Sequence, residues 1–202
     1  LKKEGIVVIP GVLNENKISE SKNIINEILK DVENKDPSGM GYEDDNYVVS
    51  GKKIFGISYF DLSNHSKSVI VVRQGSDQGM IDIFNVDKLL GVSCENLKEI
   101  FFSQWLLNLL NYGDKKINPK NLNLYVNNSI TKTRGFHVDS YYRSIKGFIY
   151  LTDVNCLEDG PYCFVKGTHV ENSLGKLNKI IGDKEAPIID PLKIIPVLGK
   201  KG

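Results

Sequence analysis

The residues of this chain whose types and spacing could do chemistry are a histidine and an aspartate two positions apart. They stand in the run GFHVD at 135–139, and the whole chain holds only three histidines. If this stretch is extended, the imidazole of His137 and the carboxylate of Asp139 lie on the same face of it. One imidazole and one carboxylate are two of the three ligands in the 2-His-1-carboxylate set that binds non-haem Fe(II). The spacing makes this pair a candidate metal site. The alternative is a surface histidine with an aspartate as its hydrogen-bond partner.

Other polar side chains gather around this pair in the sequence. Residues 122–127 alternate, which places Asn123, Tyr125 and Asn127 on one face of an expected strand. In the alternative reading, Tyr125 is a core aromatic whose hydroxyl reaches the surface. Cationic side chains that flank the pair could bind an anionic substrate or be solvated surface charges, namely Arg134, Arg143 and Lys146.

The elements that must position these residues change in type along the chain. Helical periodicity predicts a helix at 15–32, capped by Asn14, and a second helix at 93–112 whose apolar face includes Trp105. Short strands are expected at 6–9, 53–60, 80–84, 121–129, 145–154, 161–165 and 193–197, and a surface loop is expected at 33–46. Helices followed by strands indicate an α+β protein in which helices pack on an antiparallel sandwich or barrel.

Three further motifs follow the His-Asp pair in a fixed order. The expected strand at 145–154 ends in LTDV, an acidic turn with Gly and Pro follows at 158–161, and the run KGTH closes the series at 166–169. With them, the sequence resembles the phytanoyl-CoA dioxygenase family of Fe(II)/2-oxoglutarate oxygenases. That family shows H-x-D, an LTDV-like strand end, an acidic NGP turn and a PGSH-like turn. The opening residues 5–13 and the helix after them are also similar to the family, so the resemblance covers nearly the whole chain. Lys166 stands where the family usually has proline.

The resemblance implies a fold and a domain organisation. The expected core is a double-stranded β-helix (a jelly roll, as in cupins) with N-terminal supporting helices. Residues 1–202 would form a single, incomplete oxygenase domain, helix-rich over 1–115 and built of jelly-roll strands over 120–202.

The resemblance also implies a site and a reaction. His137 and Asp139 would hold Fe(II) together with a distal histidine, and 2-oxoglutarate and O₂ would be co-substrates in the hydroxylation of a small molecule. Tyr125 and Asn127, on the strand before H-x-D, would contact 2-oxoglutarate. In the family, the histidine of the PGSH-like turn is structural, so we do not assign His169 as the third ligand, although it would complete a set within this chain.

The remaining parts of the family's site are expected outside these 202 residues. The chain begins with Leu1 and stops at Gly202, just after a strand-like run, so both ends look cut. We therefore expect the distal histidine, and the arginine that grips 2-oxoglutarate, to lie beyond Gly202.

The composition of the chain limits the classes of partner and the cell compartments that we expect for it. Lys+Arg 26 against Asp+Glu 25 gives a formal net charge of +1, which provides no general attraction to nucleic acid or to an anionic membrane. Three cysteines, no apolar run of about 20 residues and no signal-peptide core favour a cytoplasmic protein. The expected partner, a small-molecule substrate, is what the resemblance implies. The oligomeric state stays open. Two rival functions also stay open: a non-catalytic jelly-roll binding domain (a pseudoenzyme), and a cupin-type isomerase or metalloenzyme that uses a different metal.

Overall fold

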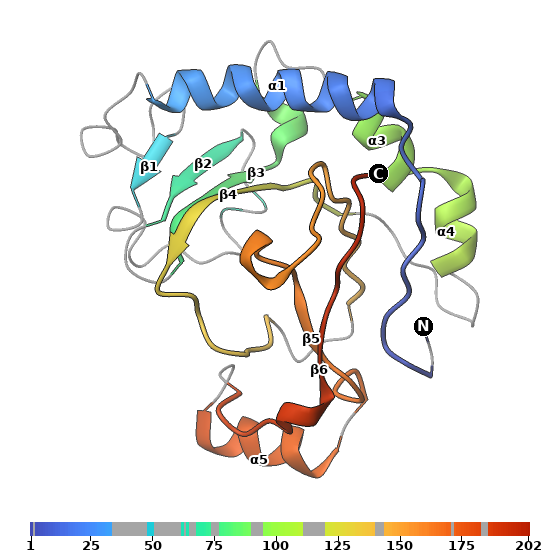
Figure 1. Cartoon of the computed structure of the whole chain (residues 1–202), viewed down its shortest axis with the longest axis vertical. Helices are drawn as coiled ribbons and strands as arrows, with labels where there is room; N and C mark the ends of the chain where they lie inside the picture. The colour runs from blue at the N-terminus through green and yellow to red at the C-terminus, as the bar shows by residue number, and fades with distance from the viewer. Residues whose placement is uncertain are drawn as a thin grey trace. The chain divides into compact units, whose positions relative to one another are not determined.

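A computed structural model of the chain combines helices with short, mostly antiparallel strands (Figure 1). It describes residues 1, 3–33, 48–50, 62, 64, 68–73, 77–89, 95–110, 120–139, 144–170, 172–182 and 186–202. The helices are α1 (Glu15–Glu33), α3 (Glu95–Phe101), α4 (Gln104–Leu110) and α5 (Ser173–Gly182), with short 3₁₀ turns η1 (Val86–Lys88), η2 (Leu157–Asp159) and η3 (Pro191–Lys193). The strands are β1 (Val48–Ser50), β2 (Val69–Val72), β3 (Gln78–Phe84), β4 (Leu124–Thr131), β5 (Cys163–Val165) and β6 (Ile194–Pro196).

The chain divides into two compact units that differ in their secondary structure. Unit 1 comprises Leu1–Glu15 and Arg134–Gly202, and unit 2 comprises Asn16–Thr133. The candidate ligands His137 and Asp139 therefore belong to unit 1, whereas Tyr125 and Asn127 belong to unit 2. Each unit is described by itself below.

Unit 2 contains a four-stranded sheet in the order β1-β2-β3-β4. β1 pairs with β2 in parallel, and the other two pairings are antiparallel. β2 consists entirely of β-branched residues, which pack well on a pleated, buried surface. The core of this unit includes Val69, Val71, Ile83 and Phe84, all of them almost fully buried.

A bulge in the β3–β4 pairing requires a glycine. The register shifts between Gln78 and Met80. At Gly79, φ is +102°, and a Cβ atom there would lie 2.5 Å from the carbonyl oxygen of Asn128. Glycine is the residue that tolerates both the left-handed backbone and the close approach.

The helices of unit 2 follow the expected apolar spacing only in part. α1 begins and ends close to the predicted bounds, and Ile18 and Ile28 of its apolar stripe are buried. The segment expected as one helix over 93–112 is instead two helices. It breaks at Ser103, whose hydroxyl donates to the carbonyl of Ile100 at 2.6 Å. Trp105, expected on the apolar face of this helix, is 48% exposed.

Unit 1 is organised around its C-terminal segment. β5 and β6 form an antiparallel pair, and the Val197 amide continues it by donating to the carbonyl of Tyr162 at 2.9 Å. Further on, Val154 and Gly199 exchange two backbone hydrogen bonds, and the Gly202 amide donates to the carbonyl of Tyr150. Residues 194–202 therefore pair first with β5 and then with the segment around 150–154.

Two expected strands are wrong, and one helix was not expected. Residues 6–9 and 145–153 are not in strands, and Val154 takes part only in its bridge to Gly199. Helix α5 begins after Asn172, whose side-chain oxygen accepts from the Gly175 amide at 2.8 Å. The expected strand at 53–60 and most of the expected loop at 33–46 lie outside the described residues.

The described strands do not test the expected jelly-roll core, which stays a prediction. In the described part of unit 1, the named strands are the pair β5 and β6. Across the described ranges of the whole chain, no helix combines the length and the apolar character that are needed to span a bilayer.

Candidate metal centre

The candidate ligands lie on a short segment of unit 1 that is held by its backbone. The amide of Ala186 donates to the carbonyl of Phe136 at 2.8 Å, next to His137. Both His137 and Asp139 have exposed positions on this segment. Their side chains are 30% and 55% exposed, so the pair is accessible to an ion from solvent.

The hydrogen bond of His137 determines which ring nitrogen is free. Its Nδ1 lies 2.9 Å from the carbonyl oxygen of Gly135. A carbonyl oxygen can only accept, so Nδ1 carries the proton in this bond, and the neutral ring then has its lone pair on Nε2. In histidines that bind metals, the N–H of the second ring nitrogen usually donates a hydrogen bond to a backbone carbonyl or a carboxylate in this way.

The free nitrogen faces the carboxylate as the spacing predicted. His137 Nε2 lies 3.6 Å from Asp139 Oδ1. Two neighbouring ligands, each about 2.1 Å from an octahedral ion, are about 3 Å apart, so this separation is close to what one shared ion requires. The structure therefore brings together the two side chains that the sequence pairs, with a nitrogen lone pair and a carboxylate oxygen turned toward each other.

Lys146 binds the other oxygen of the same carboxylate. Its ammonium donates to Asp139 Oδ2, while Oδ1 faces His137. Burial raises the pKa of Asp139, but the hydrogen bond from Lys146 and the positive charges of Lys146 and Arg134 outweigh it and lower the pKa below its usual value. Asp139 is therefore a carboxylate, the form that binds metals, at neutral pH.

Two stacked aromatic rings lie close to this ion pair. Phe148 and Tyr162 stack with their ring centroids 5.1 Å apart, and about half of each residue is exposed. Burial raises the pKa of Tyr162, Lys146 lowers it, and Asp139 raises it again. The phenol is therefore close enough to Lys146 and Asp139 to feel both charges. Neither Phe148 nor Tyr162 was predicted from the sequence as a site residue, although Phe148 stands two positions after Lys146, at the spacing of one strand face.

His169 has a different environment. A Cβ atom placed on Gly5 would overlap the ring of His169, so the N-terminal segment runs directly against this imidazole. Within the described residues, no three His, Cys, Asp or Glu side chains come together as a metal-binding group. His137 and Asp139 are thus the two predicted ligands that the described structure brings together.

Tyr125 and Asn127 lie on β4 of unit 2, where both are exposed. β4 alternates as predicted, and its register pairs Tyr125 with Asp82 and Asn127 with Met80 on β3. Asp82 is buried and accepts from Arg73 Nε at 2.7 Å. The contact of Tyr125 and Asn127 with 2-oxoglutarate stays a prediction. Arg143, the third flanking cation, lies outside the described residues.

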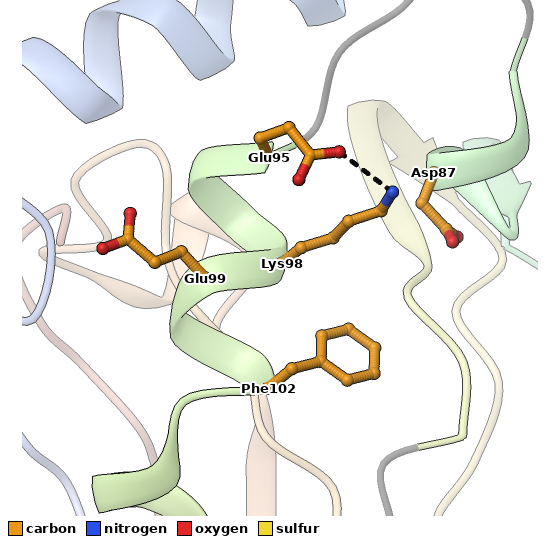
Figure 2. A pocket seen from close by; sticks show the side chains of 5 residues that line it. All are labelled: Asp87, Glu95, Lys98, Glu99 and Phe102. Atoms are coloured by element: carbon orange, nitrogen blue, oxygen red, sulfur yellow. Dashed lines mark hydrogen bonds and ion pairs between the residues drawn. The ribbon is translucent and has the colours of Figure 1, made fainter.

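Unit 2 also has a surface hollow of about 690 Å³ beside α3 and η1. Figure 2 shows its lining residues, with Lys98 paired to Glu95 at 3.2 Å and Asp87 across from them. The remaining lining residues are Glu99 and Phe102. None of the predicted site residues lines this hollow.

In the comparisons with known proteins, no family model, no curated protein and no solved structure matches this chain.

Proposed function

We propose that this chain is part of an Fe(II)- and 2-oxoglutarate-dependent oxygenase of the phytanoyl-CoA dioxygenase type, with a jelly-roll core, which hydroxylates a small molecule. The observation that carries the proposal is the state of His137. Its Nδ1 lies 2.9 Å from the carbonyl oxygen of Gly135, so the neutral ring has its lone pair on Nε2, which lies 3.6 Å from Asp139 Oδ1.

The residues of this pair fit a divalent ion in their chemistry as well as in their separation. An imidazole nitrogen and a carboxylate oxygen are ligands that Fe(II) accepts, and each has the outer hydrogen bond that ligands of bound metals usually have. When bound, the ion and its co-substrates would supply the oxidising chemistry. The protein's own contribution would be to hold the ion through Nε2 and Oδ1 and to offer the stacked rings of Phe148 and Tyr162 as an apolar surface for substrate.

Other parts of the site belong to the same proposal. Tyr125 and Asn127 would bond 2-oxoglutarate, and a distal histidine and an arginine from beyond Gly202 would complete the set. We place the protein in the cytoplasm, consistent with the free thiols of Cys156 and Cys163.

A second candidate function is a non-catalytic binding domain of the same fold. The observation that favours it is the contact between Lys146 and Asp139, because the ammonium already neutralises the carboxylate without a metal. The two candidates differ in whether a divalent ion displaces or joins this ion pair.

The proposal is tested by assaying the full-length protein for succinate formation from 2-oxoglutarate in the presence of Fe(II) and O₂. We expect iron-dependent succinate, and its loss in His137→Ala and Asp139→Ala, because each variant removes one ligand. The matched control is His169→Gln, which changes a histidine that lies against Gly5 and should retain turnover.

Equal succinate formation in the wild type and in His137→Ala would contradict the assignment of His137 as a ligand. A folded protein without iron-dependent turnover, in which Fe(II) also fails to bind, would favour the non-catalytic candidate.

A further inference from the structure

The contact between Lys146 and Asp139 has a consequence for metal binding. Lys146 donates to Oδ2 of the carboxylate, and the remaining oxygen, Oδ1, faces His137 Nε2. The two carboxylate oxygens are therefore assigned to different partners.

We propose that Lys146 is a positioning residue, which holds the Asp139 carboxylate in the one rotation that presents a single oxygen to a metal ion on His137. This inference rests on the proposed function, because it takes His137 and Asp139 as the metal pair. Lys146 itself touches neither the metal nor the substrate.

The need for such a residue follows from the freedom of an aspartate side chain. The terminal torsion of aspartate is broad, so an exposed carboxylate turns easily between orientations. More than half of the Asp139 side chain is exposed. A hydrogen bond that occupies Oδ2 limits this rotation and keeps Oδ1 directed at His137. Metal binding then costs less conformational entropy, because the carboxylate is already held in the orientation that binds the ion.

The charge of Lys146 acts in the opposite direction on affinity. An ammonium near the site repels a divalent cation, and both side chains of the pair are half exposed, so the repulsion is screened by solvent. If charge alone mattered, removal of Lys146 would strengthen metal binding. If positioning dominates, removal of Lys146 weakens it. The two effects therefore predict opposite signs for the same variant.

The decisive variant is Lys146→Met, which keeps most of the length of the side chain and removes both the donor and the charge. The measurement is the affinity of the purified protein for Co(II), an air-stable probe, by calorimetric titration. We expect Lys146→Met to lose about tenfold in affinity, the usual scale for removing a hydrogen-bond partner of a ligand. Lys146→Arg, which restores a charged donor, should stay within about threefold of the wild type.

The matched control is Lys193→Met. Lys193 also forms an ion pair with an aspartate, Asp190, at 3.5 Å in the same unit, and its side chain is similarly exposed. It should bind Co(II) like the wild type. Exposed ion pairs contribute little to stability, so both methionine variants are expected to fold. Lys146→Gln replaces Lys146→Met if the latter does not fold, and its affinity should fall between those of the Arg variant and a variant without a donor.

Each outcome has one meaning. Weaker binding in Lys146→Met, with recovery in Lys146→Arg, supports the positioning role. Equal or tighter binding in Lys146→Met, while His137→Ala is weakened, overturns the role of Lys146 and leaves the proposed function standing. Equal Co(II) binding by the wild type and His137→Ala overturns the metal pair, and the inference with it.

Discussion

The chemistry available to His137 depends on which of its ring nitrogens carries the proton. The carbonyl of Gly135 accepts from Nδ1, so in the neutral ring the lone pair is on Nε2, the nitrogen that faces Asp139. A histidine with the opposite tautomer would present an N–H to that carboxylate and would be an ordinary surface hydrogen-bond donor. The backbone two residues upstream thus selects the metal-binding form of the ring.

In unit 2, a buried asparagine side chain holds neighbouring segments in place through its hydrogen bonds. Asn85 is 1% exposed and has a left-handed backbone with φ of 50°. Its side-chain amide donates to the carbonyl of Leu62 at 3.1 Å, and its side-chain oxygen accepts from Asn121 at 2.9 Å.

We predict that Asn85→Ala lowers the free energy of unfolding by about 2–4 kcal/mol, because the buried carbonyl of Leu62 and the part-buried amide of Asn121 each lose a hydrogen bond and alanine tolerates the backbone conformation poorly. Urea denaturation of the two proteins measures this difference. Asn23→Ala, at an exposed position of α1, should change it by less than about 0.5 kcal/mol. Equal effects of the two substitutions would show that the Asn85 contacts are not stabilising.

At the scale of elements, the bulge at Gly79 sets the register between β3 and β4. β4 is the strand that carries Tyr125 and Asn127. Beyond the bulge, β4 keeps its alternation, so these two side chains share a face. The register therefore determines which residues of β4 can act together.

We predict that Gly79→Ala destabilises unit 2 by about 2–3 kcal/mol, because the added Cβ meets the carbonyl of Asn128 and φ is positive. The matched control is Gly11→Ala, where φ is +71° and a Cβ meets nothing within 4 Å. This control should cost only the backbone strain, about 1 kcal/mol. Thermal denaturation compares the two, and a loss at Gly79 no larger than that at Gly11 would contradict the steric argument.

The sequence predicted the elements that have strong local signals. α1 and β3 to β6 follow from apolar periodicity, β-branched runs and turn residues. The break at Ser103 was missed because the apolar pattern continues through it. The strand expected over 145–154 was wrong, apart from the bridge at Val154, although its residues favour strands. That segment finds backbone partners at Tyr150 and Val154, from residues 45 or more positions later, and local patterns do not report such partners. Helix α5 had a usable signal in Asn172, an N-cap residue before a helical apolar spacing.

The same limit applies to the site. Because His137 and Asp139 are two positions apart, their spacing by itself predicts that both side chains lie on one face of an extended segment. The contact of Lys146 with Asp139 and the stacking of Tyr162 on Phe148 depend on how separate segments fold back on each other. The sequence pattern therefore could not predict that these side chains meet.

At the scale of the molecule, the carboxylate of Asp153 joins the loop before β5 to the chain's C-terminal residues in unit 1, and the carboxylate of Asp159 stabilises a turn within the same loop. The Lys201 amide donates to Asp153 at 3.0 Å, and Lys200 forms an ion pair with the same carboxylate at 3.0 Å. Asp159 accepts from the backbone amides of Asn155 and Cys156. Hydrogen bonds from the Lys201 amide and from Lys200 lower the pKa of Asp153, and hydrogen bonds from Asn155 and Cys156 lower that of Asp159.

We predict that unit 1 loses stability in acid. A carboxylate whose pKa is lowered on folding stabilises the fold above its unfolded value of about 4, and this stabilisation is lost as the pH falls through the lower, folded value. Amide hydrogen exchange between pH 7 and pH 3, corrected for the intrinsic rate, should show faster opening around Val154 and Gly199 in acid. A variant with Asp153→Asn and Asp159→Asn should show a flatter pH dependence, and an unchanged slope in this variant would contradict the assignment.

We propose above all that His137 and Asp139 hold a ferrous ion together. The most direct measurement is an anaerobic titration of the full-length protein with Fe(II) and 2-oxoglutarate, followed through the weak visible charge-transfer absorption of the complex. We predict that this band forms in the wild type and is lost in His137→Ala, while His169→Gln retains it. A correctly folded wild type without the band, or a band that persists in His137→Ala, would contradict the account.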